Sequence, residues 1–195
     1  MDIIEQIEEI FRRHGGRCYD GARVEPVSAL EHALQCAWLA EWARADTALV
    51  AAALLHDIGH LIDTGGGTDS IDDVHELRGV GLLASSFPAA VLEPIRLHVQ
   101  AKRYLVALDP SYGAQLTPAS AHSLRLQGGA FDASQMHQFE DQPHAEAAVM
   151  LRRWDDQAKT PGRCTPPLAY YLSLLEELRA GARMPRRTIV GAFDA

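Results

Sequence analysis

The chain has 195 residues, of which 47% are hydrophobic and 23% charged, and its formal net charge is −8. This size and composition suit one globular domain with a sizeable core, and the acidic balance argues against a nucleic-acid backbone as the main partner. The longest apolar run, residues 48–55, is far shorter than the roughly 20 residues that a membrane span needs. We expect a monomer or weak homo-oligomer with a small-molecule partner, no nucleic acid and no membrane.

The N-terminus and the cysteines indicate a cytoplasmic protein. The first residues are acidic and lack the basic region of a signal peptide. Three cysteines, Cys18, Cys36 and Cys164, are widely scattered and form no CxxC pair, which favours reduced thiols in the cytoplasm. None of them has the spacing of a metal ligand, so we interpret all three as structural or incidental.

The first part of the chain predicts two helices separated by a loop. Apolar residues recur every three or four positions over residues 3–11, which predicts a short amphipathic helix that a pair of glycines ends. Residues 17–27 predict a lid loop. Ser28 suits the N-cap of a second helix, and Glu31 completes a capping box for it. This helix extends to about residue 44.

The middle of the chain predicts a buried helix followed by a glycine-rich loop. Residues 46–57 carry Ala and Leu on all sides of the helix axis, which is typical of a buried central helix. Residues 61–73 include three consecutive glycines and predict a loop. Further helices are expected at residues 74–86, 88–106, 133–140, 145–159 and 168–179, with turns and short helix over 109–129 and a linker over 161–167.

No strand pattern, internal repeat or second domain is evident, so we expect an all-α helical bundle. The N-terminal helix and lid loop (residues 1–27) precede a core over residues 28–160. A C-terminal helix over residues 168–180 precedes a loosely held tail over 181–195. The tryptophans are expected to pack in the core: Trp38, Trp42 and Trp154.

The strongest motif is HDIGH, residues 56–60, at the end of the buried helix. His56 and Asp57 are costly to bury in an apolar setting unless a partner compensates them. A divalent metal does so, because imidazole nitrogen and carboxylate oxygen suit Fe, Mn, Co and Ni. Adjacent helical residues point about 100° apart. One metal between these two neighbours therefore needs a helix end, which Gly59 permits.

Other residues supply candidates for the rest of a metal site. His32 lies among apolar residues, His75 opens the helix after the glycine-rich loop, and Asp155 lies in LRRWDDQAK. His98 is followed one helical turn later by Lys102. Four His and two Asp are a sensible donor set for two neighbouring metals with one bridging carboxylate. Taken alone, each residue is better explained as a hydrogen-bonded polar side chain at a helix end.

The order of these residues resembles a known family. His32, His56-Asp57 and a later Asp follow the H…HD…D pattern of the HD superfamily, and His75 and His98 mark its branch with two metals. The segments EHALQCA, ALLHDIGH, HVQAKRYL, LQGG and RRWDDQAK are similar to the HD-domain mixed-valent di-iron oxygenases of organophosphonate breakdown, the PhnZ group. The resemblance extends over residues 19–159 and implies the HD-domain helical bundle.

The resemblance implies two iron ions in a mixed-valent Fe(II)/Fe(III) pair. One iron would be bound by His32, His56, Asp57 and Asp155, and the other by His75 and His98 with Asp57 as the bridge. The residues that match the family's phosphonate pocket are His60, Lys102, Ser120, Ser123 and Arg152. Lys and Arg donate charge-assisted hydrogen bonds to a phosphonate and serine hydroxyls fill its other acceptor positions. Both serines are equally compatible with ordinary loop residues.

Two residues of the lid loop complete the resemblance. Glu25 lies where the family places a carboxylate that meets a substrate amine; the alternative is an exposed loop residue. Tyr19 corresponds to a mobile tyrosine that covers the iron until substrate displaces it. Tyr19 and Glu25 are six residues apart, which is wider than the family's spacing, so the role of the tyrosine and the exact substrate depend on a longer loop.

The implied activity is oxidative cleavage of the carbon–phosphorus bond of a 1-hydroxyphosphonate by O2, with Asp57, His75, His98 and Tyr19 as catalytic residues. The substrate (R)-2-amino-1-hydroxyethylphosphonate would give glycine and phosphate. Its trimethylammonio analogue, which would give glycine betaine, is the nearest alternative. Two other classes stay open: an HD-type metal-dependent phosphohydrolase, and a non-catalytic helical domain that holds metal or a nucleotide. Dependence on O2 separates the three.

Overall fold

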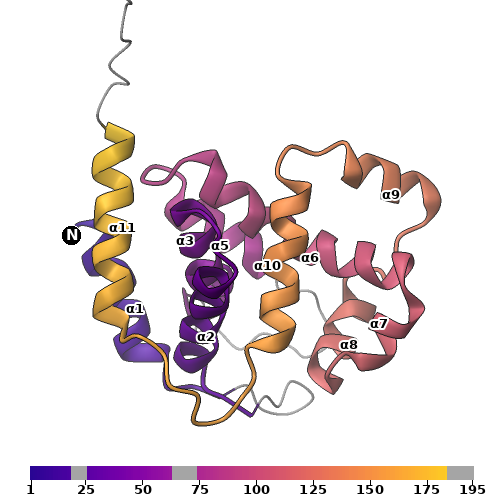
Figure 1. Cartoon of the computed structure of the whole chain (residues 1–195), viewed down its shortest axis with the longest axis horizontal. Helices are drawn as coiled ribbons and strands as arrows, with labels where there is room; N and C mark the ends of the chain where they lie inside the picture. Colours follow the sequence, from indigo (N-terminus) through magenta and orange to yellow (C-terminus); the bar gives the residue numbers. More distant parts are fainter. Residues whose placement is uncertain (19–25, 63–73, 184–195) are drawn as a thin grey trace, which may run out of the picture.

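The computed structural model of the chain describes residues 1–18, 26–62 and 74–183, which form helices joined by turns and loops (Figure 1). The expected all-α fold is confirmed, because no residue in these ranges belongs to a β-strand. The helices are α1 (Ile3–His14), α2 (Ala29–Trp42), α3 (Thr47–Leu55), α4 (Ile58–Ile62), α5 (His75–Leu83), α6 (Ala89–Leu108), α7 (Pro110–Gln115), α8 (Pro118–Leu126), α9 (Ala133–Glu140), α10 (Ala145–Gln157) and α11 (Leu168–Arg183).

The helix starts follow local sequence signals. Ser28 caps α2, and its hydroxyl accepts from the backbone of Glu31 while the Glu31 carboxylate accepts from the backbone of Ser28. The predicted capping box is therefore confirmed. Asp132 caps α9 in the same way. These side chains satisfy amide groups that have no partner within the helix.

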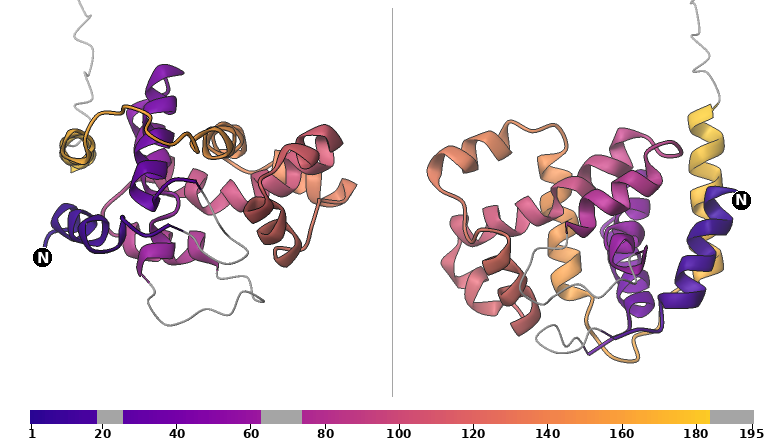
Figure 2. Two further views of the ribbon diagram at one scale, coloured as in Figure 1. Left: turned by 90° about the horizontal axis from the view of Figure 1, so that it is seen from below. Right: turned by 180° about the vertical axis from the view of Figure 1, so that it is seen from behind.

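The central helix of the bundle is α3. Every residue from Leu49 to Leu55 is buried, as its all-round apolar sequence predicts. Helices α2, α6, α10 and α11 all pack against α3 (Figure 2). The larger core surrounds α3, and a smaller cluster around Phe139 joins α6, α9 and α10. The polar site described below opens beside α3, where α2, α6 and α10 meet it.

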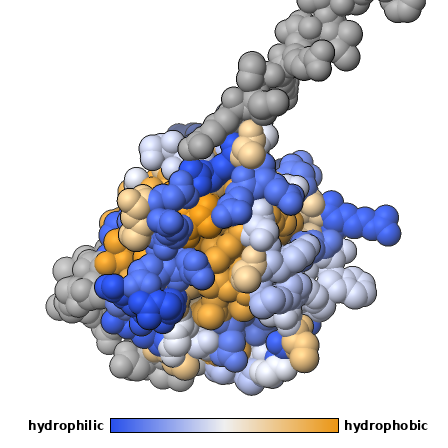
Figure 3. Space-filling model, turned by 90° about the vertical axis from the view of Figure 1, so that its left-hand side faces the viewer, coloured by the Kyte–Doolittle hydropathy of each residue, from blue (hydrophilic) through white to orange (hydrophobic). Residues whose placement is uncertain are grey.

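Two groups of outer helices lie at opposite ends of the molecule (Figure 1). At one end α1 packs beside α11, and Arg179 of α11 donates to the carboxylate of Asp2 at 2.6 and 2.9 Å. On this face apolar side chains gather in the middle and hydrophilic ones border them (Figure 3). At the other end α7, α8 and α9 lie beside α6. They cover the side of α6 that faces away from the larger core.

The expectation that all three tryptophans pack in the core is wrong for Trp42. Trp154 is buried, but Trp42, the last residue of α2, is 73% exposed. Its ring contacts Trp38 edge-on with the centroids 5.9 Å apart. The helical period of α2 continues to this residue, but its side chain lies on the surface of the molecule. Separately, none of the helices within the described part of the chain is long and apolar enough to cross a membrane.

Candidate metal centre and adjoining pocket

The HDIGH motif lies at a break between two helices. Helix α3 ends at Leu55 and α4 begins at Ile58, so His56 and Asp57 form the connection. The Nδ1 atom of His56 donates to the carbonyl oxygen of Ala53 at 2.9 Å, which directs Nε2 away from the helix. His56 Nε2 lies 3.5 Å from Asp57 Oδ1. The helix end that the motif requires is therefore present.

One group of donor atoms combines His32, His56, Asp57 and Asp155. The two imidazole Nε2 atoms lie 3.3 Å apart. His32 Nε2 is 3.4 Å from Asp155 Oδ1 and 3.8 Å from Asp57 Oδ2. The Nδ1 atom of His32 donates to the carbonyl oxygen of Ala158, just after α10, at 3.0 Å. Backbone carbonyls thus hold both rings with Nε2 facing the carboxylates.

A second group combines Asp57 with His75 and His98. Asp57 Oδ1 lies 3.3 Å from His75 Nε2 and 3.7 Å from His98 Nε2, and the two Nε2 atoms are 3.1 Å apart. The Nδ1 atom of His98 donates to the carbonyl oxygen of Ile95 at 2.7 Å. His75 differs, because its Nδ1 faces the Glu76 carboxylate at 3.6 Å. Asp57 therefore lies within 4 Å of histidine nitrogens of both groups.

The protonation states of these residues suit metal ligands. Burial lowers the pKa of His32, and it lowers the pKa of His98 well below its usual range, so burial favours the neutral form of both rings. Burial opposes the charged carboxylates, but His56 and its neighbours hold the pKa of Asp57 well below its usual range. For Asp155, Arg152 likewise outweighs burial and lowers the pKa. Neutral imidazoles and ionised carboxylates are the forms that bind metal.

The donor set fits first-row transition metals. Its ligating atoms are imidazole nitrogens and carboxylate oxygens, and in each group they lie within 4 Å of a neighbouring donor. Asp57, His75 and His98 form a set of two histidines and one carboxylate, which is typical of non-haem iron in oxygenases. The negative charge of the Asp57 carboxylate would offset the positive charge of a metal in either group.

A cavity adjoins both ligand groups, and most of the expected phosphonate residues line it. Its polar lining includes His60, Lys102, Ser120, Ser123 and Arg152, with Lys159 beside them. Its apolar lining is formed by Val27, Val99, Ala119 and Leu126. The structure therefore brings the metal-ligand candidates and the cationic candidates to one space. Tyr19 and Glu25 lie outside the described residues.

The two serines are tied to the cations. Lys102 Nζ donates to Ser123 Oγ at 2.7 Å, and Ser123 Oγ donates to the carbonyl oxygen of Ser120 at 3.1 Å. Ser120 Oγ accepts from Arg152 Nη2 at 3.4 Å and from Lys159 Nζ at 3.3 Å. Ser120 and Ser123 lie on α8, so the alternative of ordinary loop residues does not describe them.

The two buried cations differ in their electrostatic surroundings. Arg152 donates to Asp155 at 2.6 Å, and it also contacts Asp156 and the hydroxyl of Tyr112. Burial opposes its charge, but these carboxylates raise the pKa of Arg152 well above its usual range. Burial and nearby Arg152 lower the pKa of Lys102 to about 7. An anion in the cavity would therefore stabilise the charged form of Lys102.

His60 occupies the wall of the cavity beside the second ligand group. Its ring stacks on that of His75, with the centroids 3.8 Å apart and the planes 16° apart. His60 Nε2 lies 4.0 Å from Asp57 Oδ1. The side chain therefore faces both the ligand group and the cavity.

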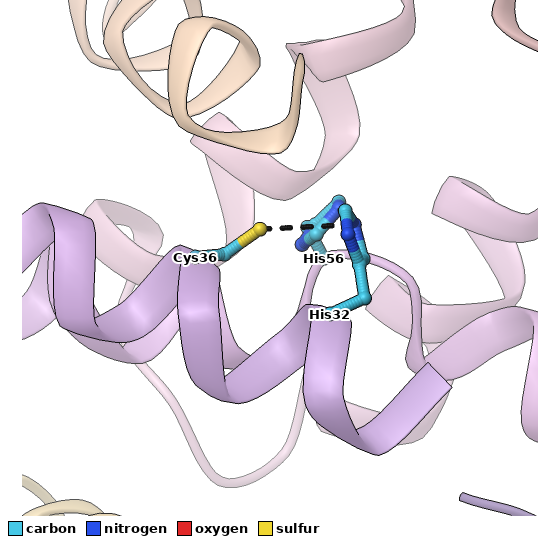
Figure 4. Close-up of side chains that lie close together, drawn as sticks. All are labelled: His32, Cys36 and His56. Carbon is cyan, nitrogen blue, oxygen red and sulfur yellow. Dashed lines mark hydrogen bonds between the residues drawn. The ribbon is translucent and has the colours of Figure 1, made fainter. Parts of the chain in front are cut away.

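Sequence reasoning missed several residues of the site. The expectation that no cysteine has the spacing of a metal ligand is wrong for Cys36, whose Sγ lies 3.7 Å from His32 Nε2 (Figure 4). The four-residue separation on one helix was the available signal. Lys159 lies four residues after Asp155, and this separation likewise indicates that it faces the site. Tyr112 lies on the short helix α7, which has no sequence periodicity to reveal it.

The chain matches one family of known proteins and is similar in sequence to two named dioxygenases. The HD domain family matches residues 29–126 of the chain. Over 177 residues the chain is 42% identical to hydroxymethylphosphonate dioxygenase of Gimesia maris, with 89% of this chain and 86% of that protein covered. Over 180 residues it is 37% identical to (1-hydroxy-2-(trimethylamino)ethyl)phosphonate dioxygenase (glycine-betaine-forming) of Leisingera caerulea, with 91% of this chain and 90% of that protein covered.

Proposed function

The chain belongs to the HD-domain family, as its motifs predict, and we propose that it is an oxygenase that cleaves the carbon–phosphorus bond of a 1-hydroxyphosphonate. The observation that carries this proposal is the shared cavity. A set of two histidines and one carboxylate lines one side of it, and Lys102 and Arg152 line another. The first set suits redox-active iron, and the cations suit a phosphonate.

The metals in this proposal are two iron ions in a mixed-valent Fe(II)/Fe(III) pair. His32, His56, Asp57 and Asp155 would hold one, and Asp57, His75 and His98 the other. When bound, iron supplies the activation of O2 and the electron transfer that oxidises the hydroxyl-bearing carbon. The protein holds the imidazole rings through backbone carbonyls at Ala53, Ile95 and Ala158. Such outer contacts fix ring orientation before a metal arrives.

The phosphonate group would be bound by the cationic side of the cavity. Lys102 and Arg152 donate charge-assisted hydrogen bonds to its oxygens, and the hydroxyls of Ser120 and Ser123 orient the two cations. Arg152 is fixed by two carboxylates, so it offers a preorganised donor. The pKa of Lys102 is about 7, so a bound anion would shift this amine toward its charged form. The apolar residues Val99 and Leu126 limit water around the reacting carbon.

The proposed substrate is (R)-2-amino-1-hydroxyethylphosphonate, which with one O2 gives glycine and phosphate. Hydroxymethylphosphonate, with one O2, would give formate and phosphate in the same reaction. The trimethylammonio analogue would give glycine betaine. Glu25 is proposed to favour the primary amine, because a carboxylate accepts N–H hydrogen bonds from an ammonium group and a trimethylammonium group has none to donate. Tyr19 is proposed to cover the metal site until the substrate displaces it.

A substrate panel tests this choice. Iron-reconstituted protein is incubated in air with each of the three hydroxyphosphonates, and the carbon product and phosphate are both quantified. Glu25→Gln should lower kcat/KM for the primary amine roughly 10- to 100-fold, the range for one charge-assisted hydrogen bond. Hydroxymethylphosphonate has no amine and serves as the internal control. Equal loss for both substrates would contradict a role of Glu25 in amine recognition.

The alternative is an HD-type phosphohydrolase, in which the metals activate water. A phosphate ester carries the same anionic group and would fit the same cations. Anaerobic assays with a panel of phosphate esters distinguish this alternative. Hydrolysis without O2, together with no turnover of any hydroxyphosphonate in air, would replace the oxygenase proposal.

A further inference from the structure

Cys36 places a sulfur donor beside the first ligand group. It lies on α2 four residues after His32, so the two side chains share one face of the helix. The thiol is completely buried, and its Sγ lies 3.7 Å from His32 Nε2 (Figure 4). Sγ and the donor nitrogens of His32 and His56 all lie within 4.8 Å of one another. Three potential ligand atoms therefore converge without any contribution from the phosphonate side of the cavity.

The two imidazoles are already oriented for this set. Their Nδ1 atoms donate to the carbonyl oxygens of Ala158 and Ala53, which leaves the two Nε2 atoms 3.3 Å apart and that of His32 3.7 Å from the thiol sulfur. Two imidazoles and one thiolate, with water in the fourth position, suit the tetrahedral coordination that Zn²⁺ prefers, whereas a soft thiolate is not part of the oxygen- and nitrogen-rich set described above.

We propose that His32, Cys36 and His56 form an alternative binding site for a thiophilic dication such as Zn²⁺ or Cd²⁺. The cation replaces the thiol proton, which is released to solvent, and sulfur becomes a direct ligand. The same two histidines cannot then serve iron. Because Zn²⁺ has no redox chemistry, protein loaded in this way is inactive as an oxygenase. The choice of metal at loading thus determines whether the chain is active.

The competing explanation is that Cys36 is a small buried residue that only packs against His32. Under that explanation sulfur never binds a metal. The other two cysteines, Cys18 and Cys164, are exposed, so they can be replaced with little effect on packing. Replacing both of them leaves Cys36 as the single thiol that can be observed.

The first test uses the Cys18→Ser/Cys164→Ser variant, in which Cys36 is the only cysteine. Metal-free protein is titrated with Cd²⁺ without thiol reductants, and the sulfur-to-cadmium charge-transfer band is followed in the near ultraviolet. We expect the band to saturate at one Cd²⁺ per chain. Cd²⁺ bound without the band, or no Cd²⁺ binding at all, would overturn the proposal. This test keeps Cys36 and does not depend on whether a Cys36 variant folds.

The second test compares Zn²⁺ and Fe(II) affinities of Cys36→Ala with those of Cys164→Ser. Loss of a residue that hydrogen-bonds to a metal ligand typically lowers metal affinity roughly 10- to 100-fold. Because Cys36 would be a direct ligand, Cys36→Ala should lower the affinity for Zn²⁺ by at least this factor and leave the affinity for Fe(II) unchanged. An equal fall for both metals would show that the thiol only packs. Neither test uses phosphonate turnover, so failure here is distinguishable from failure of the proposed function.

Discussion

A side chain on Gly59 would collide with the backbone of His75. A Cβ atom built on Gly59 lies 1.9 Å from the carbonyl oxygen of His75 and 2.7 Å from its carbonyl carbon. Helices α4 and α5 therefore approach backbone to backbone at this point. The contact sets the position of His75, the first residue of α5 and one of the proposed ligands. The glycine of the HDIGH motif thus positions a residue on the next helix.

Gly59→Ala is expected to destabilise the fold by about 1–3 kcal/mol, because two backbones must separate. It should also reduce metal binding at the His75–His98 group. Gly81→Ala on α5 is the matched control, since nothing lies within 4 Å of its Cβ position. That change should raise stability by up to about 1 kcal/mol through helix propensity. Denaturant unfolding and metal analysis measure both effects. Wild-type metal content and stability in Gly59→Ala would contradict this role.

His98→Ala should remove one of the two proposed metals. The second ligand group then keeps only Asp57 and His75, while the first group is intact. We expect iron content to fall from two to one per chain and oxygenase activity to be lost. His137→Ala on α9, whose side chain is 82% exposed, is the control and should retain both metals. Retention of two irons by His98→Ala would refute the division into two groups.

Lys102 makes the stability of the metal-free protein depend on pH. Its pKa falls from 10.5 to about 7 on folding, so the unfolded chain binds more protons between these values. Lys102 therefore makes the free energy of unfolding rise as the pH rises from about 7 to 10.5. Below about pH 7 the amine is charged in both states, and the full cost of burying its charge is present. Lys102→Met should stabilise the fold more at about pH 6 than at about pH 9. Urea unfolding at both pH values measures the difference, and an equal or opposite difference would contradict the assignment.

Tyr112 should contribute to phosphonate binding through Arg152. Its hydroxyl accepts from Arg152 Nε at 3.3 Å and donates to Asp156. Tyr112→Phe is expected to cost about 1 kcal/mol in stability and to raise KM for the phosphonate severalfold, with kcat little changed. Tyr104→Phe is the control, because that hydroxyl donates to the exposed Glu140 at 2.9 Å. If both variants showed the same KM, Tyr112 would have no positioning role.

The sequence predicted the features that depend on local pattern. The capping box of Ser28 and Glu31, the buried central helix and the helix end at His56-Asp57 all follow from residues close together in the chain. Features that depend on distant contacts were missed or left open. The sequence around Ser120 does not distinguish it from a loop residue, whereas its place on α8 and the hydrogen bonds that it accepts from Arg152 and Lys159 depend on the fold.

Two wrong expectations have different physical causes. Trp42 continues the period of α2, but exposure depends on whether another helix covers that end, which periodicity does not report. Cys36 is far from the other cysteines in the sequence, but its relevant neighbour is His32, four residues earlier. Mixed donor sets on one helix face need to be sought across residue types.

The most direct test of the proposed activity is phosphate release from (R)-2-amino-1-hydroxyethylphosphonate by iron-reconstituted protein, measured in air and under nitrogen. We expect release in air only, with one glycine formed and one O2 consumed for each phosphate released. Equal release with and without O2 would contradict the oxygenase and indicate hydrolysis at the same histidine and aspartate groups.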